Sequence, residues 1–165
     1  MVLFDFNDVF VKFSEAVKAK FGKLPQDMTK TEYDAAMSSL VRTTFYKDLE
    51  KQPLGFDLLK WALTFRDKEV SLILVNEVKS PIWVNKEKID YMDAACLAMG
   101  LPTLYFNTCT PEELKGYSWL GPLVTRNYER RRVWDSQPGG YRSAYMEDDI
   151  TMTIWNINQS YAQHE

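Results

Sequence analysis

Short apolar runs alternate along the chain with stretches in which apolar residues recur at helical spacing. Residues 2–6 form an apolar run of strand length, and residues 70–75 (VSLILV) form a second one that is rich in β-branched residues. Residues 101–106 (LPTLYF) resemble a third strand. The pattern therefore predicts at least three strands spread over the whole chain.

Helical patterns fill the region after the first strand. Residues 10–21 predict a helix that ends at Gly22, a residue type that favours the left-handed C-terminal position. Thr29 and Glu32 have the spacing of a capping box, which predicts the start of a second helix that reaches about residue 40. Two helices are thus expected between the first strand and the middle of the chain.

The middle of the chain continues the alternation. Pro53 and Gly55 predict a turn, followed by a helix over residues 56–65. Beyond the second strand, residues 86–99 are amphipathic and predict a helix that ends at Gly100. Strands separated by helices favour an α/β fold with a mostly parallel sheet.

The last third of the chain is harder to assign. A TPEEL motif begins at residue 110 and is typical of a helix start, whereas residues 117–143 are aromatic and basic and contain the turn signal SQPGG. We expect residues 117–143 to be irregular with short strands. A closing helix is expected after the acidic run at residues 147–149.

Composition narrows the class of protein. With 165 residues and 45% hydrophobic content, the chain suits one domain with an ordinary core. The net charge of −3 gives no general attraction to nucleic acid, and no apolar run is long enough to cross a membrane. Because the first strand starts at residue 2, we expect no targeting peptide and a cytoplasmic location.

Candidate chemistry is limited by the rarity of histidine and cysteine. His164, close to the end of the sequence, is the sole histidine, which argues against Ser/His/Asp triads and most zinc sites. Cys96 and Cys109 are the two cysteines, and we expect them to be reduced, with Cys96 packing on the apolar face of its helix. Carboxylates, lysine and hydroxyl groups must therefore carry any catalysis.

Polar residues follow three apolar segments of the sequence. They are Asp5, Asn7 and Asp8; Asn76 and Glu77; and Glu147, Asp148 and Asp149. Ligand sites of parallel sheets lie outside the carboxyl ends of the strands, where such residues would converge on a magnesium ion and a phosphate group. The alternative is that each cluster only caps the helix that follows it.

Several motifs, taken in order, resemble the haloacid dehalogenase-like (HAD) phosphatase superfamily and, within it, the small 5'(3')-deoxyribonucleotidases of phages, bacteria and mitochondria. Residues 5–9 (DFNDV) resemble the opening DxDGV motif, and FGKLPQDMTKTEY resembles the start of the helical cap. FYKDLEKQPLGFDLL, KIDYM and MEDDITMTI resemble the FFxxLxxxPGAxEAL, KxxWV and IDDRPENI segments, although Leu54 replaces a favoured glycine. The resemblance spans nearly the whole chain.

This resemblance implies a single HAD-like domain over residues 1–165, built as a Rossmann-like three-layer sandwich with a helical cap inserted at about residues 14–62. It implies Asp5 as the nucleophile that forms an aspartyl phosphate, and Lys88 and Asn76 as phosphate-binding residues. It further implies a Mg²⁺ ion held by Asp5, the backbone carbonyl of Asn7, Asp148 and Asp149.

Asn7 departs from the family pattern at the position of the general acid/base. An amide can donate a hydrogen bond to a leaving oxygen but cannot deliver or accept its proton, and loss of such a group typically costs about 10²–10⁴-fold in rate. Asp8 is adjacent, but its side chain is expected to point elsewhere, so we do not expect it to substitute. Asn76, where the family has threonine or serine, can still donate to phosphate.

Two further groups of residues have competing interpretations. Phe45 and Tyr46 fall where the resemblance implies aromatic cap residues near a nucleobase, and the alternative is packing of the cap against the core. Residues 126–132 contain a basic cluster, which either contacts phosphate or an acidic protein partner or is a solvated surface with acidic neighbours. The cluster consists of Arg126, Arg130, Arg131 and Arg132.

Two functional hypotheses follow. The first is a magnesium-dependent phosphatase of nucleotidase type, in which Asp5, Asn7 and Lys88 act on a nucleoside monophosphate and Asn7 weakens the activity. The second is a catalytically impaired HAD-fold binding module for a nucleotide or a protein, such as an accessory protein of a phage.

Overall fold

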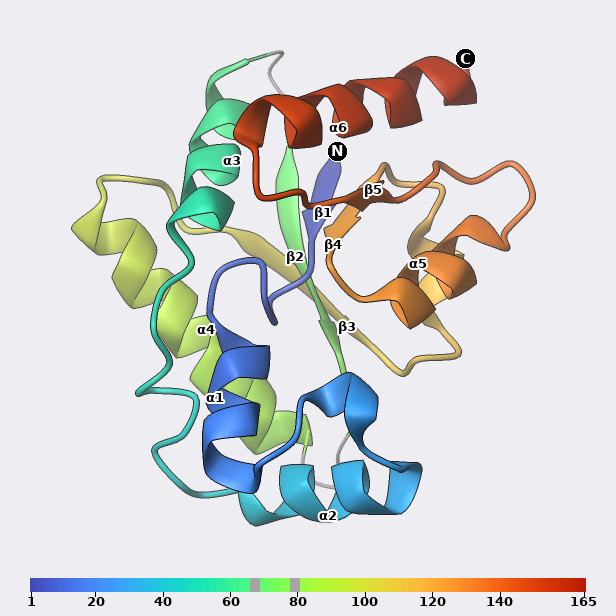
Figure 1. Cartoon of the computed structure of the whole chain (residues 1–165). Coiled ribbons are helices and arrows are strands. Elements are labelled where there is room, and N and C mark those ends of the chain that lie inside the picture. The colour runs from blue at the N-terminus through green and yellow to red at the C-terminus, as the bar shows by residue number, and fades with distance from the viewer. Residues whose placement is uncertain (66–68, 78–80) are drawn as a thin grey trace.

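The computed structural model describes residues 1–65, 69–77 and 81–165. Five parallel strands form one sheet in the order β3-β2-β1-β4-β5. The strands are β1 (Val2–Phe4), β2 (Val70–Val75), β3 (Tyr105–Cys109), β4 (Leu123–Thr125) and β5 (Ala144–Tyr145). The predicted α/β class with a parallel sheet is therefore confirmed, and helices on both faces make it a Rossmann-like three-layer sandwich (Figure 1).

Alternation along the strands divides the core between the two faces of the sheet. Val2 and Phe4 of β1 point to the face covered by α3 (Pro53–Thr64), α4 (Pro81–Ala98) and α6 (Ile150–His164). Leu3 points to the other face, where it shares a smaller apolar cluster with Trp134 of α5 (Tyr128–Asp135). Both faces of this central strand are buried, as is typical of parallel sheets.

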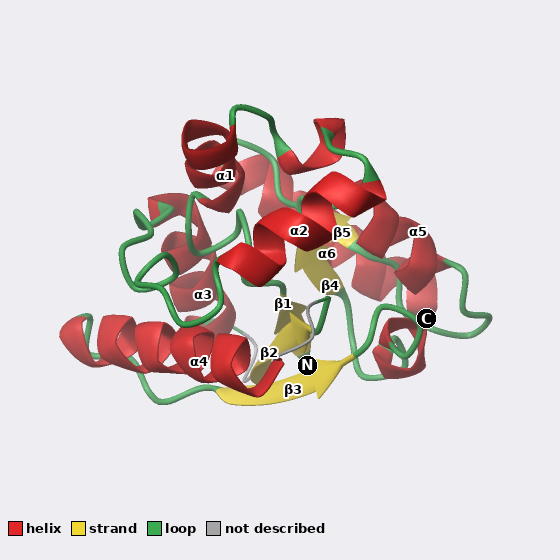
Figure 2. Cartoon of the chain, turned by 90° about the horizontal axis from the view of Figure 1, so that it is seen from below, coloured by secondary structure: helices red, strands yellow, loops and turns green. Residues whose placement is uncertain are grey.

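Two helices lie beyond the end of the sheet toward which the strands run. They are α1 (Phe13–Phe21) and α2 (Lys30–Ser39), joined by the short 3-10 helix η1 (Pro25–Asp27). Figure 1 shows both helices below the strands, and Figure 2, seen from that end, shows α2 crossing in front of the sheet. This placement puts α2 over the carboxyl ends of the strands, where a parallel sheet offers its ligand site.

The predicted helix signals in this region are confirmed. Thr29 Oγ1 accepts the backbone N–H of Glu32, and Glu32 Oε1 accepts the backbone N–H of Thr29, both at 3.1 Å. Gly22 ends α1 with φ of 83°, a left-handed conformation that glycine adopts without steric cost. The exact limits of the cap, expected at residues 14–62, stay a prediction; α3, in the second half of that range, packs against β2 and α6.

Several predicted boundaries moved. The helix expected from residue 56 begins at Pro53, because proline lacks the N–H that would remain unpaired at a helix start. The strand expected at residues 101–106 occupies Tyr105–Cys109, because the backbone N–H of Leu101 closes α4 by bonding to the carbonyl of Cys96 at 2.8 Å. Gly55 also approaches the loop after β1 so closely that a Cβ would lie 1.8 Å from the carbonyl oxygen of Val9.

Residues 117–143 contain more order than the sequence predicted. β4 lies directly beside β1, and α5 follows it after Arg126 and Asn127. Asn127 caps α5 by accepting the backbone N–H of Arg130 at 3.0 Å. The short 3-10 helix η2 (Leu114–Tyr117) precedes β4, where TPEEL predicted a helical turn.

Within the described residues, no helix combines the length and the apolar character that crossing a membrane requires.

Candidate functional site

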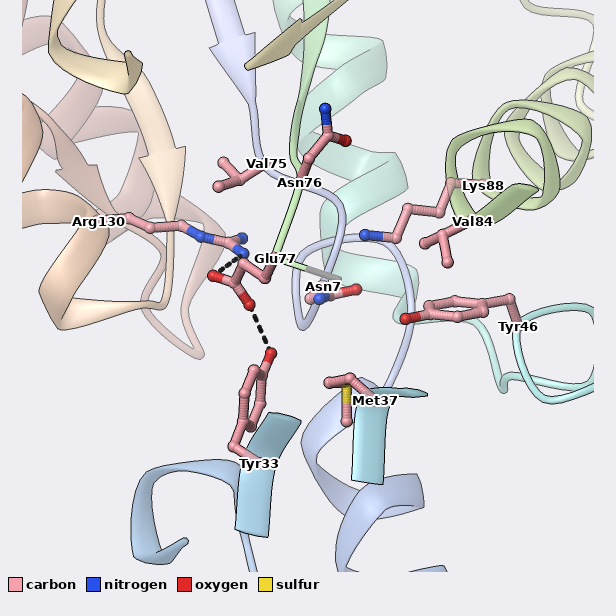
Figure 3. Close-up of a pocket in the computed structure, with 10 residues that line it drawn as sticks. All are labelled: Asn7, Tyr33, Met37, Tyr46, Val75, Asn76, Glu77, Val84, Lys88 and Arg130. Atoms are coloured by element: carbon pink, nitrogen blue, oxygen red, sulfur yellow. Dashed lines mark hydrogen bonds and ion pairs between the residues drawn. The ribbon is translucent and has the colours of Figure 1, made fainter. Parts of the chain in front are cut away.

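The candidate site lies at the carboxyl ends of β1, β2 and β4, beneath α2. It contains a cavity of about 20 Å³, enough for about one water molecule (Figure 3). The cavity is lined by Asn7, Tyr33, Met37, Tyr46, Val75, Asn76, Glu77, Val84, Lys88 and Arg130. The structure thus brings together four residues predicted from the sequence: Asn7, Asn76, Lys88 and Tyr46.

Asp5, the predicted nucleophile, is buried at the end of β1, and its carboxylate accepts four hydrogen bonds. Arg130 Nη1 donates to Oδ1 at 2.5 Å and to Oδ2 at 2.7 Å. The backbone N–H of Phe6 donates to Oδ1 at 2.9 Å, and the Thr125 hydroxyl donates to Oδ2 at 2.8 Å. A carboxylate has about four lone-pair positions, so the acceptor capacity of Asp5 is used.

Arg130 joins Asp5 to the helix above the site. Its second terminal nitrogen, Nη2, donates to Glu77 Oε1 at 2.9 Å, and the Tyr33 hydroxyl of α2 donates to Glu77 Oε2 at 2.6 Å. Figure 3 shows Glu77 between these two partners. A continuous chain of hydrogen bonds therefore connects Asp5 on β1 to Tyr33 on α2.

The pKa shifts in this chain follow from burial and charge. Burial alone would raise the pKa of Glu77, but the Arg130 guanidinium and the Tyr33 hydroxyl outweigh burial and hold that pKa below its usual value. Burial would lower the pKa of Arg130, but Asp5 and Glu77 outweigh it and raise that pKa. Glu77 and Arg130 consequently form an ionised, buried network at neutral pH.

Lys88 has a different environment. It is only 5% exposed and lies on the inward face of α4, one turn after Val84. Its Nζ faces the rings of Phe6, at 5.6 Å, and Tyr46, at 5.4 Å, and it makes no hydrogen bond or ion pair within the described part of the chain. Burial, reinforced by the charge of Arg130, lowers the pKa of Lys88 to about 8.

Asn7 and Asn76 add amide groups to the same cavity. Asn7 Oδ1 is buried and has no hydrogen-bond partner among the described residues. Asn76 Oδ1 accepts from Asn85 Nδ2 at 2.8 Å, which leaves the NH₂ of Asn76 as its donor for a ligand. Lys88, Asn7 and Asn76 therefore carry unused hydrogen-bonding capacity beside a space that holds about one water molecule.

Asp8 is engaged with the start of α1. The residue has φ of 64°, and its carboxylate accepts the backbone N–H of Ser14 at 2.8 Å and the Ser14 hydroxyl at 2.5 Å. These contacts direct the carboxylate at the first turn of α1, which is the capping role weighed for acidic clusters.

The aromatic residues Phe45 and Tyr46, predicted to belong to a cap, are packed against each other and against Phe13. Tyr46 is buried, with Phe45 edge-on at 5.4 Å and Phe13 parallel to it at 6.4 Å between ring centroids. Phe45 also lines a separate open groove of about 420 Å³ beside α1 rather than the strand-end cavity. Of the two, Tyr46 alone borders the candidate site.

Asp148 and Asp149 lie away from Asp5 in the sheet order. They follow β5, the edge strand, whereas the strand beside β1 is β4. The Asp148 side chain is 97% exposed and pairs with Arg126 Nη2 at 3.1 Å. Asp149 caps α6 by accepting the backbone N–H of Thr151 at 2.7 Å.

These donors do not fit the magnesium ion that the resemblance implies. The strand end beside Asp5 carries Thr125, whose hydroxyl donates to the carboxylate, rather than a second acidic group. In the described residues, no three His, Cys, Asp or Glu side chains are placed to share a metal ion. We therefore assign no step of chemistry to a metal at Asp5.

The basic cluster at residues 126–132 has partners within the chain. Arg126 pairs with Asp148, Arg130 with Asp5 and Glu77, and Arg132 with Glu129 on the surface of α5. Arg131 Nε donates to the hydroxyl of Ser143 at 3.1 Å, and its guanidinium lies over the ring of Tyr145 at 5.5 Å. Binding of a protein partner through this cluster stays a prediction.

Sequence reasoning gave no individual role in the site to four of its residues: Arg130, Glu77, Tyr33 and Thr125. A signal for Arg130 was available, because Arg130 and Trp134 are four residues apart and both face inward on α5. Glu77 was expected among the strand-end residues that would converge on a magnesium ion and a phosphate group, but it was given no individual role. Tyr33 and Thr125 carried no signal, since their contacts join segments that are distant in the sequence.

Comparison with protein-family models finds no match to this chain, and comparison with curated protein sequences finds none either. The function of this chain is therefore inferred from the geometry of the site and from the resemblance of the motifs.

Proposed function

We propose that this protein is a HAD-like binding module that holds a phosphomonoester, such as a nucleoside monophosphate, without hydrolysing it. The observation that carries the proposal is a contrast within one site. Lys88 is a buried ammonium group with no carboxylate partner among the described residues, whereas Asp5 already has a full set of partners.

Support for anion binding comes from the cost of burying Lys88. An ammonium group removed from water is destabilising unless a partner compensates it, and here two aromatic rings at 5.4 and 5.6 Å supply the contacts of its Nζ. A phosphate oxygen at the cavity would give Lys88 the ion pair that it lacks. Asn76 lines the same cavity, and its NH₂ donates no hydrogen bond to another described residue.

Support for the absence of hydrolysis comes from Asp5 and Asn7. A nucleophilic carboxylate needs a free lone pair to attack phosphorus, and the four bonds that Asp5 accepts leave none. Asn7 cannot exchange the proton of the leaving group. Nucleophilic attack and proton transfer, the two chemical steps that the resemblance implies, therefore each lack their reactive group.

Ligand entry requires a movement of the cap. The cavity holds about one water molecule, and Tyr33, Met37 and Tyr46 line it from the cap side. A phosphoryl group is larger than this space, so α2 or the Tyr46 side chain must move outward when the ligand binds. The Tyr33–Glu77 hydrogen bond is one contact that such a movement would break.

The test is binding measured separately from turnover. Isothermal titration calorimetry with a panel of nucleoside monophosphates and inorganic phosphate is expected to show saturable binding that Lys88→Met abolishes. Lys86→Met is the matched control, because Lys86 lies on the exposed side of α4 and pairs with Asp90. Absence of binding to every member of the panel would reject the proposal.

Hydrolysis is the second candidate, because Asn7, Asn76 and Lys88 line one cavity as the resemblance implies. Phosphate release from the same nucleotides would support it, provided that Asp5→Asn removes the activity. Release no greater than that of Asp5→Asn leaves the binding module as the function.

A further inference from the structure

We infer that the guanidinium group of Arg130 replaces the divalent cation that a HAD-like site would hold at Asp5, so that this site operates without a metal. The inference concerns Asp5 and Arg130 and does not depend on which ligand binds at Lys88.

The contacts of Asp5 place a positive charge where a metal would bind. Arg130 Nη1 contacts both carboxylate oxygens, at 2.5 and 2.7 Å, and the remaining lone-pair positions receive the Phe6 N–H and the Thr125 hydroxyl. A metal ligand must offer a lone pair to the ion. Asp5 would have to lose Arg130 or another donor before it could coordinate one.

Arg130 also opposes a dication electrostatically. Its guanidinium is a buried cation in contact with Asp5 and Glu77, the carboxylates nearest to a metal placed at Asp5. A Mg²⁺ ion beside these carboxylates would lie close to that cation in a region screened poorly by water. A site that retains Arg130 is therefore electrostatically unsuited to Mg²⁺.

The position of Arg130 is built into the fold. β4 pairs with β1, and α5 starts two residues after β4 ends, with Asn127 bonded to the backbone N–H of Arg130. Arg130 thus lies in the first turn of α5, beside the end of β1. A guanidinium does not lose its proton in proteins and binds a carboxylate with fixed geometry, so this cation is permanent and independent of metal supply.

If Arg130 fills the position of a metal ion, removal of its guanidinium should open that position to a metal. In Arg130→Ala, Asp5 and Glu77 would keep their carboxylates and gain the space that Arg130 occupied. Two carboxylates beside such a space offer oxygen ligands to Mg²⁺ or Mn²⁺. The variant should therefore acquire metal-dependent stabilisation that the unmodified protein lacks.

The experiment compares the melting temperature in excess MgCl₂ or MnCl₂ with that in EDTA. For the unmodified protein we expect the same melting temperature in all three conditions. For Arg130→Ala we expect a lower melting temperature that rises by about 2–4 °C with metal, and Arg130→Ala/Asp5→Asn should lose that rise. Arg132→Ala is the control, since Arg132 lies on the exposed side of α5.

Two results would overturn the inference. One is stabilisation of the unmodified protein by metal that Asp5→Asn abolishes, which would mean that the ion displaces or accompanies Arg130. The other is a folded Arg130→Ala that gains nothing from metal, which would mean that Arg130 does not fill a cation position. If Arg130→Ala does not fold, the measurement on the unmodified protein and Asp5→Asn still decides the question.

Discussion

The two halves of the strand-end site differ in how far their polar groups are satisfied. In the half built on β1, β4 and α5, Asp5 and Arg130 are paired, and Arg130 is linked further to Glu77 and Tyr33. In the half built on α4, Lys88 contacts aromatic rings but no carboxylate among the described residues. Both halves are buried and border one cavity.

This difference separates the residues that stabilise the site from those available to a ligand. A buried ion pair whose members satisfy each other has little capacity left for another group. A buried cation without a partner destabilises the folded state, and a function that uses it would explain its presence. Perturbing each half should therefore change stability in opposite directions.

Removing Asp5 tests the half of the site in which Asp5 and Arg130 are paired, and it should have the largest effect on stability. In Asp5→Ala, Arg130 would lose the counter-ion that contacts its Nη1, and we expect the free energy of unfolding to fall by about 3–5 kcal/mol. Urea denaturation followed by circular dichroism measures this loss. Arg132→Ala, which breaks an exposed pair on the same helix as Arg130, should leave stability nearly unchanged.

A double variant tests whether the contributions of Asp5 and Arg130 to stability depend on each other. Asp5→Ala/Arg130→Met removes both charges, so we expect it to be less destabilised than the sum of the two single variants. Additive losses would show that Asp5 and Arg130 do not depend on each other, and the comparison between the two halves would fail.

Removing the charge of Lys88 should have the opposite effect. Lys88→Met retains an apolar side chain of similar length, and we expect it to stabilise the protein by about 1–3 kcal/mol at pH 7 while it abolishes phosphate binding. Lys86→Met on the exposed side of α4 should do neither. Destabilisation by Lys88→Met would show that Lys88 is compensated in the folded state.

The stabilisation expected for Lys88→Met should depend on pH, because it follows from the pKa of Lys88. The folded protein releases the Lys88 proton near pH 8, whereas the unfolded chain retains it to about pH 10.5. Because the unfolded state binds more protons between these values, this group makes the unmodified protein more stable as pH rises through that window. The advantage of Lys88→Met should therefore be full below pH 8 and fade above it.

Tyr33→Phe tests the link between the paired half and the cap, with a smaller effect. The variant removes the hydroxyl that donates to Glu77 at 2.6 Å, and we expect a loss of about 1–2 kcal/mol in the free energy of unfolding. Tyr105→Phe is a suitable control, because Tyr105 is 74% exposed on edge strand β3. Equal stability of the two variants would show that the Tyr33 bond does not hold the cap.

Much of the fold could be predicted because its signals are local. The capping box at Thr29, the left-handed Gly22 and the apolar run of β2 are each determined by neighbours within a few residues. β4 lies in a region where short strands were expected without bounds, and α5 was not predicted, because its eight residues include three arginines. Their order follows from pairing with β1 and packing on the sheet.

The candidate site, like the fold, could be predicted only where its signals are local. Asn7, Asn76 and Lys88 line one cavity because the ends of parallel strands and the helix after β2 meet there. The Asp5–Arg130 pair joins residues 125 positions apart, so no local pattern reveals it. Asp148 was expected to bind the metal because its segment resembles a motif of the HAD superfamily, and the strand order places it beyond β4.

Asn7→Asp should have the smallest effect, and that outcome carries information. A single amide-to-carboxylate change would restore the general acid/base and about 10²–10⁴-fold in rate if Asn7 were the only defect of the site. Because Arg130, Thr125 and Phe6 still occupy the lone pairs of Asp5, we expect no phosphate release above that of Asp5→Asn in a malachite-green assay with nucleoside monophosphates. Activity that appears in Asn7→Asp and disappears in Asp5→Asn/Asn7→Asp would show that Asp5 exchanges its partners for a substrate, and the division between a paired and an available half would no longer describe the site.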